Sequence, residues 1–213
     1  MTHVGFTKED FHTFTIEGLE PRMEAIRASI QPKFQIIGEE LRAHLAHSLD
    51  TDMHLHIAQH ARRTTNPPND TWLAVASNKR GYKKHPHFQV GLFDDHLFIW
   101  LAFIYELPGK QDIAKLFLEH EEDLNTTIPQ DYVVSLDHTK KPAESFQTLD
   151  LTASLERFRD VKKAEFLVGK HVSPHDPIVQ DGEALMSEIK KTVDTLLPLY
   201  KLSYTALNEP SIE

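Results

Sequence analysis

The 213-residue sequence contains no cysteine. It therefore forms no disulfide, and it lacks the thiolate that cysteine nucleophiles, iron–sulfur clusters and Cys-type zinc sites require. A chain of this length buries enough apolar surface to fold without disulfides. The lack of cysteine fits a reducing compartment, and we expect a cytoplasmic protein.

Long apolar segments are also missing. The longest apolar run, residues 97–107, is much shorter than the roughly 20 residues of a membrane-spanning helix. The first residues, MTHVGFTKEDF, show neither the charged region nor the apolar core of a signal peptide. We expect no membrane association and no export.

Common catalytic motifs are absent as well. The sequence has no GxSxG, GxGxxG or HExxH pattern, and AEFLVGKH lacks the first glycine and the hydroxyl residue of a phosphate-binding loop. We therefore predict no cofactor.

Positive charge is scarce and concentrated in one region. The formal net charge is −9, yet residues 61–90 hold six basic residues and one acidic residue, so the remainder carries −14. Proteins that bind nucleic acid along an extended face are usually basic overall, because such binding neutralises many phosphates. General nucleic-acid binding is disfavoured.

Apolar periodicity predicts the helices. Steps of three and four predict a helix interrupted at Pro32, with a buried stripe of Met23, Ile26, Ile30, Phe34, Ile37, Leu41 and Leu45. Further helices are predicted after an N-cap at Asp112, over 151–158, and over 185–200 with Pro198 disturbing the end.

Alternating apolar residues and turn signals predict the strands. Four of them, at 53–60, 71–77, 87–93 and 96–106, follow one another like an antiparallel meander, and two more are expected at 132–136 and 165–168. Residues 138–147 lack periodicity and are expected to form an ordinary loop. The prediction is one α+β domain over residues 1–213, with the meander sheet in the first half covered by amphipathic helices.

The basic stretch NKRGYKKHPHF, residues 78–88, provides the first candidate site. In a meander its loop joins the second and third strands, at the same sheet end as Asp50 and Asp52. Clustered cations beside an aromatic ring suit phosphate or carboxylate groups. The candidate ligand-binding residues are Lys79, Arg80, Tyr82, Lys83, Lys84 and His87. The alternative is a solvated hairpin loop that lysines keep soluble.

Arg62 and Arg63 form a second basic cluster at the opposite end of the predicted sheet. A strand of about seven residues, at about 3.3 Å per residue, separates the two clusters by roughly 20 Å. We expect no common patch, and local pairing of these arginines with Asp70 and Asp94-Asp95.

Histidine is abundant, with fourteen in the chain. His54, His56 and His60 are predicted to share a strand face, with His85 and His87 nearby, an arrangement that suggests zinc. Strand neighbours two apart need not converge, so we assign no metal and keep the first three only as weak candidates. The acids Glu106, Asp112, Glu165 and Asp176 are interpreted as caps and surface charges.

Five segments are similar to the YktB-like family of uncharacterised proteins from Bacillus-type bacteria. They are FTKEDFHTF, GLEPRMEAIR, HARRTTNPPNDTW, NKRGYKKHPHFQVGLF and FLVGKHV, and they extend from Phe6 to about Val172. The resemblance implies a single cytoplasmic domain with helices and strands. It implies no reaction, cofactor or catalytic residue.

Two functions therefore compete. The first is a non-catalytic module that binds a small anionic or phosphate-bearing ligand through the loop at 78–87, which we favour over an enzyme. The second is a hydrolase-like enzyme that uses His54, His56 or His60 with His87 as metal ligands or general bases. We expect a monomer or a weak homo-oligomer.

Overall fold

A seven-stranded antiparallel sheet organises the computed structural model, which describes residues 3–207 of the chain. The strands are β1 (His54–Ile57), β2 (Thr71–Ala76), β3 (His87–Leu92), β4 (Leu97–Phe103), β5 (Val133–Ser135), β6 (Glu144–Ser145) and β7 (Phe166–Val172). They lie in the order β1-β2-β3-β4-β7-β5-β6. The first four form the predicted meander, and strands from the second half extend it.

The helices lie mainly before and after the meander. They are α1 (Lys8–His12), α2 (Leu19–Ala25), α3 (Gln31–Leu49), α4 (Lys110–Glu119), α5 (Glu121–Thr127), α6 (Leu151–Asp160) and α7 (Gly182–Ala206). Short 3₁₀ turns occupy Thr13–Thr15 and Pro177–Val179. The α+β prediction is confirmed over residues 3–207. The first two and last six residues of the predicted 1–213 domain lie outside the described part.

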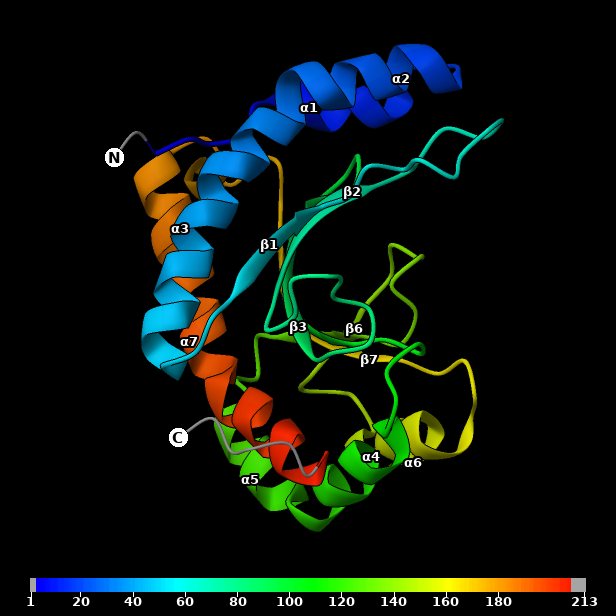
Figure 1. The fold of residues 1–213 in the computed structure, drawn as a ribbon, viewed down its shortest axis with the longest axis vertical. Helices are drawn as coiled ribbons and strands as arrows, with labels where there is room; N and C mark the ends of the chain where they lie inside the picture. Colours follow the sequence, from blue (N-terminus) through cyan, green and yellow to red (C-terminus); the bar gives the residue numbers. More distant parts are fainter. Residues whose placement is uncertain (1–2, 208–213) are drawn as a thin grey trace.

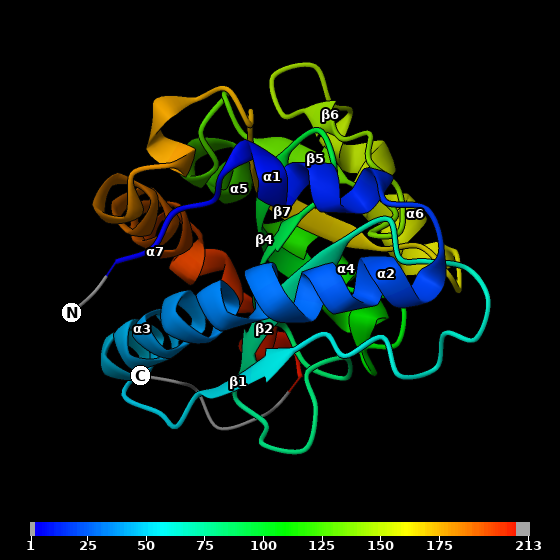
Figure 2. The same cartoon turned by 90° about the horizontal axis from the view of Figure 1, so that it is seen from above.

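Alternating residues of β4 separate the two faces of the sheet. Leu97, Ile99, Leu101 and Phe103 join the main core with the helices, whereas Phe98, Trp100 and Ala102 belong to a second apolar cluster. Figure 1 shows α3 and α7 along one side of the sheet and loops on the other, and Figure 2 shows these two helices side by side. We call the two sides the helix-covered face and the loop-covered face.

The interruption predicted at Pro32 is a π-helical turn at Ile26–Ile30, which links α2 to α3. Pro32 lies in the first turn of α3, where a missing backbone N–H leaves no hydrogen bond unmade. All seven residues of the predicted apolar stripe are buried.

Gly169 in β7 marks a close approach of two strands. A Cβ atom there would lie 1.9 Å from the carbonyl oxygen of Ile99 in β4, and atoms cannot approach so closely. The glycine of FLVGKHV therefore serves strand pairing.

Several predicted boundaries were wrong. Helix α4 begins at Lys110, after Gly109 in a left-handed conformation. Asp112 therefore lies inside the first turn of α4 and is not its N-cap. The first strand ends at Ile57, and His60, which was predicted to belong to it, lies beyond its end with a left-handed backbone of φ 51°. Pro198 lies inside α7, which continues to Ala206. Of the helices within residues 3–207, none combines the length and apolarity needed to cross a bilayer.

Candidate functional site

The basic loop, residues 78–86, connects β2 to β3 at the sheet end where β1 starts, as the meander predicts. Lys79, Arg80, Lys83 and Lys84 are exposed. Lys83 forms an ion pair with Glu106, with 3.0 Å between Nζ and Oε1. The loop is therefore a cationic surface of which one cation is locally neutralised.

Tyr82 folds back from the basic loop onto the loop-covered face. Its hydroxyl oxygen accepts a hydrogen bond of 2.9 Å from the indole N–H of Trp72. The ring lies between His56 and His87, with centroid distances of 5.6 and 4.9 Å. Burial raises the pKa of the phenol. Tyr82 therefore anchors the loop, and packing against the two imidazoles occupies much of its ring surface.

The loop hollow, an open cavity of about 550 Å³, lies beneath the basic loop. Of the predicted ligand-binding residues, Arg80, Tyr82, Lys83 and Lys84 line it, and Lys79 and His87 do not. Glu106, at its edge, is the acid that neutralises Lys83.

A second open cavity, the turn hollow of about 520 Å³, shares Tyr82, Lys83 and Glu106 with the first. Arg62 and Arg63 line it too, so our expectation of two unconnected basic clusters was wrong. The inward fold of Tyr82 brings the basic loop toward the turn after β1. The predicted separation of the two clusters was based on strand length alone, which does not reveal such a long-range contact.

The ion pairs predicted for Arg62 and Arg63 are not formed among the described residues, although the charge of Arg63 acts on Asp70. Within residues 3–207 neither arginine forms an ion pair, and Arg63 donates instead to the carbonyl oxygens of Asn66 and Pro67. Asp94 instead forms an ion pair with Lys141, which lies in the loop after β5.

The strand histidines do not converge. The Nε2 atom of His56 donates to the carbonyl of Asn78 at 2.9 Å, and that of His60 lies 3.0 Å from the hydroxyl of Thr71. Burial lowers the pKa of His60 to about 4. Among the described residues, no metal-ligand cluster includes His54, His56 or His60.

His87 is fully buried beneath Tyr82. Nδ1 donates to the carbonyl of His85 at 2.8 Å, and Nε2 accepts from the Gln89 amide at 2.8 Å. Burial lowers the pKa of His87 to about 3, so the ring is neutral. With both nitrogens engaged, His87 supports the face of the sheet and does not reach a ligand in either hollow.

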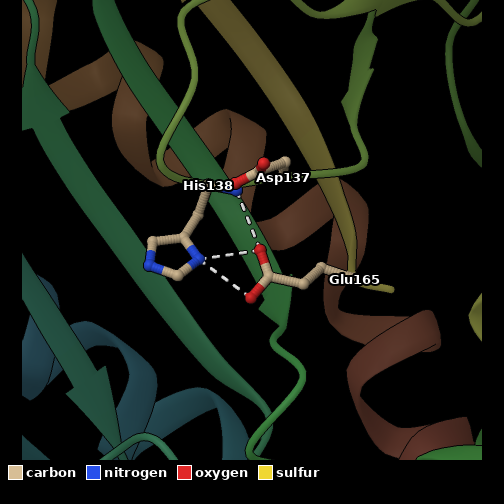
Figure 3. A group of neighbouring side chains, drawn as sticks. All are labelled: Asp137, His138 and Glu165. Carbon is tan, nitrogen blue, oxygen red and sulfur yellow. Dashed lines mark hydrogen bonds and ion pairs between the residues drawn. The ribbon is translucent and has the colours of Figure 1, made fainter. Parts of the chain in front are cut away.

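A polar contact on the loop-covered face joins His138, in the loop after β5, to Glu165, just before β7 (Figure 3). Glu165 is 2% exposed. Its Oε2 atom accepts from Nδ1 and the backbone N–H of His138, at 2.7 and 2.8 Å. Oε1 also accepts from the backbone of Tyr105 at 3.2 Å. The carboxylate therefore fixes the ring and leaves Nε2 pointing away from Glu165.

The charge state of His138 follows from these neighbours. Burial alone would lower the pKa of the imidazole, but the hydrogen bond and negative charge of Glu165, with the charges of Asp70 and Asp137, outweigh burial and raise it. Glu165 accepts through Nδ1–H, so Nε2 gains and loses the proton.

Asp137, His138 and Glu165 offer ligand atoms within 4.8 Å of one another, a separation that suits a metal ion. Their oxygens and Nδ1 already have protein partners, because Asp137 Oδ1 caps the backbone and hydroxyl of Thr139 at 3.0 and 2.6 Å. A metal would displace these hydrogen bonds. The arrangement is a hydrogen-bonded network, and we assign no metal to it.

Asp70, which immediately precedes β2, is a further acid at this face. Asp70 is 9% exposed, and its carboxylate has a hydrogen bond from its own backbone N–H. Burial raises the pKa of Asp70 to about 6, against the opposing charges of His138 and Arg63.

Sequence reasoning missed this part of the site. Glu165 was interpreted as a cap or surface charge, and His138 lay in a loop without periodicity. The one local signal is the position of Glu165 at the start of an apolar strand, where burial is common.

A protein-family comparison identifies the relationship of the chain. The model for a domain of unknown function, DUF1054, matches residues 6–200. The chain belongs to the DUF1054 family. A UPF0637 protein of Shouchella clausii is 70% identical over 95% of this chain and 96% of the relative. UPF0637 proteins of Oceanobacillus iheyensis and Listeria monocytogenes are 58% and 52% identical, over 96% and 95% of this chain and 99% of each relative. The predicted resemblance to a family from Bacillus-type bacteria is confirmed.

Proposed function

We propose that this DUF1054 protein binds a small anionic or phosphate-bearing ligand in the loop hollow. One observation carries the proposal: Arg80, Lys83 and Lys84 all line the same cavity. Among the described residues, the side chains of Arg80 and Lys84 have no ion-pair partner, so an anion would not compete with a carboxylate for them. Clustered cations without partners repel each other, and a bound anion relieves that repulsion.

The size and charge of the surroundings favour a small ligand. A cavity of about 550 Å³ is within the range that holds small molecules. The chain as a whole carries −9, which opposes binding along a nucleic-acid backbone. The proposal requires no macromolecular partner, and it fits a monomer or a weak homo-oligomer.

Thermal unfolding in the presence of inorganic phosphate or nucleoside triphosphates tests the proposal. A ligand at about 100 times its dissociation constant adds about 2.7 kcal/mol to the free energy of unfolding, which raises the melting temperature. We expect at least one of these anions to give such a shift. Higher salt should reduce it, because salt screens exposed charges over about 8 to 10 Å.

The loop supplies its own control. Arg80→Gln with Lys84→Gln should abolish the shift, whereas Lys79→Gln removes an exposed cation of the same loop that does not line the hollow and should largely preserve it. Unliganded stability should change little in either variant, since the three side chains are exposed. The proposal would be refuted if both variants lost the ligand-induced melting shift equally, or if no anion shifted the melting temperature of the wild-type protein.

A further inference from the structure

The loop hollow and the turn hollow meet at the end of β1. Ile57, the last residue of that strand, lines the loop hollow, and Ala58, the next residue, lines the turn hollow. Tyr82, Lys83 and Glu106 line both cavities. The two hollows are therefore neighbours on one surface, and these three side chains form the wall between them.

Each hollow has its own pair of cations without an ion-pair partner among residues 3–207. Arg80 and Lys84 line only the loop hollow, and Arg62 and Arg63 line only the turn hollow. Cations gathered in one place repel each other, so each pair suits an anionic group. The surface thus offers two separate places for negative charge, although the net charge of the chain is −9.

The wall between the hollows has a different character. Lys83 and Glu106 form an ion pair there at 3.0 Å, so the wall carries no net charge. An anionic group placed on the wall would meet the carboxylate of Glu106, and like charges repel. The wall therefore favours an uncharged part of a ligand, with negative charge on either side of it.

Local hydrogen bonds hold the two cation pairs in place relative to each other. Trp72 is bonded to both hollows: its indole N–H donates to the hydroxyl of Tyr82, and its carbonyl accepts from the backbone of Ala58, each at 2.9 Å. Arg63 donates to two carbonyls of its own turn, at 3.3 and 3.4 Å. A surface that is already arranged loses little conformational freedom when a ligand spans it.

We propose that the ligand of this protein is a small molecule with a phosphate group at each end and an uncharged spacer between them. One phosphate lies in the loop hollow with Arg80 and Lys84. The other lies in the turn hollow with Arg62 and Arg63, and the spacer crosses the wall. The inference rests on the proposed function for the first phosphate and adds a second phosphate site to it.

Calorimetric titration of the full-length protein with linear diol bisphosphates of increasing length tests the proposal. Each is compared with the monophosphate of the same diol. When one end of a ligand is bound, the other end stays at a high local concentration, which raises affinity by about 10² to 10⁴-fold if both sites are within reach. We expect at least one bisphosphate to bind about 100-fold more tightly than its monophosphate, with one ligand per chain. A spacer too short to span the wall should give little gain, which controls for the added charge.

Variants of the two cation pairs locate the two phosphates. Arg62→Gln with Arg63→Gln should reduce the affinity for the spanning bisphosphate to about that of the monophosphate, and Arg80→Gln with Lys84→Gln should do the same. Lys79→Gln removes an exposed cation that lines neither hollow, and it should retain the gain.

Arg62→Gln alone covers the case in which the double variant of the turn does not fold, because it keeps the hydrogen bonds of Arg63. This single substitution removes one charged donor and should weaken the spanning bisphosphate by about tenfold or more.

Fluorescence quenching by iodide reports on the second phosphate directly. Trp72 lines the turn hollow, whereas Trp100, the other tryptophan, is only 4% exposed. Iodide is attracted to the same cations as phosphate. The spanning bisphosphate should therefore protect Trp72 from iodide in the wild-type protein, and it should not do so after Arg62→Gln with Arg63→Gln.

Failure of this proposal is distinguishable from failure of the proposed function. A phosphate-dependent melting shift that requires Arg80 and Lys84, with no bisphosphate tighter than its monophosphate, overturns the second site and leaves the proposed function intact. No melting shift and no binding of any bisphosphate overturns both. A gain that survives Arg62→Gln with Arg63→Gln, or that is equal for every spacer length, overturns the spanning of the two hollows.

Discussion

Replacing Lys110 with methionine should lower the free energy of unfolding by about 3 kcal/mol, because three carbonyl oxygens lose their charged donor. Lys110 is 3% exposed. Its ammonium donates to the carbonyl oxygens of Phe158, Val161 and Ala164, at 3.0, 2.7 and 2.8 Å. Methionine fills a similar volume but has no donor, so one carbonyl in the last turn of α6 and two in the segment between α6 and β7 lose their partner.

The consequence extends to the candidate site. Lys110 ties the start of α4 to the segment between α6 and β7, and Glu165 directly follows Ala164 in that segment. A loosened segment should therefore also weaken the hold of Glu165 on His138.

Urea unfolding measures the effect, and Lys115→Met in the same helix is the control. Lys115 and its partner Asp112 are each 59% exposed, so this substitution should change stability by less than about 1 kcal/mol. For a chain of this size the Lys110 variant should melt about 10 °C lower than wild type. Similar midpoints for the two variants would contradict the role of Lys110.

The sequence predicted most elements because their signals are local. Turn residues bound the four meander strands, and apolar steps mark the buried stripe from Met23 to Leu45. The wrong predictions concerned the ends of helices and strands, where the conformation of a single residue sets the boundary. Gly109 adopts the left-handed conformation that starts α4, and the sequence offered Asp112 as a plausible alternative cap.

The candidate site was only half predictable. A dense run of cations is visible in any sequence, and three of the four loop cations line the loop hollow. The inward fold of Tyr82 was not predictable, because it depends on a hydrogen bond from the indole N–H of Trp72, ten residues earlier in the chain. The pair of His138 and Glu165 joins residues 27 apart, and no local pattern encodes such a distance.

The loop hollow and the turn hollow share part of their lining. Tyr82, Lys83 and Glu106 line both hollows, so a ligand in the loop hollow lies beside the turn hollow. The predicted strand histidines His56, His60 and His87 supply packing and hydrogen bonds around this surface.

Asp70→Asn should stabilise the protein at pH 8 and leave its stability near pH 4 almost unchanged. The pKa of the Asp70 carboxyl group is about 6 in the folded protein and about 3.8 in the unfolded chain. As pH rises between these values, the unfolded chain releases its proton first, so the free energy of unfolding falls. Above pH 6 the loss is complete, and this difference in pKa corresponds to about 3 kcal/mol.

Asparagine has nearly the same shape and cannot ionise, so the variant avoids this loss. Urea unfolding of both proteins from pH 4 to pH 8 should give curves that diverge through the window from about 3.8 to 6. Asp52→Asn removes an exposed carboxylate and should track wild type throughout. A pH-independent difference would mean that the amide acts through packing. A variant less stable than wild type at pH 8 would mean that the Asp70 carboxylate stabilises the fold, which contradicts the prediction.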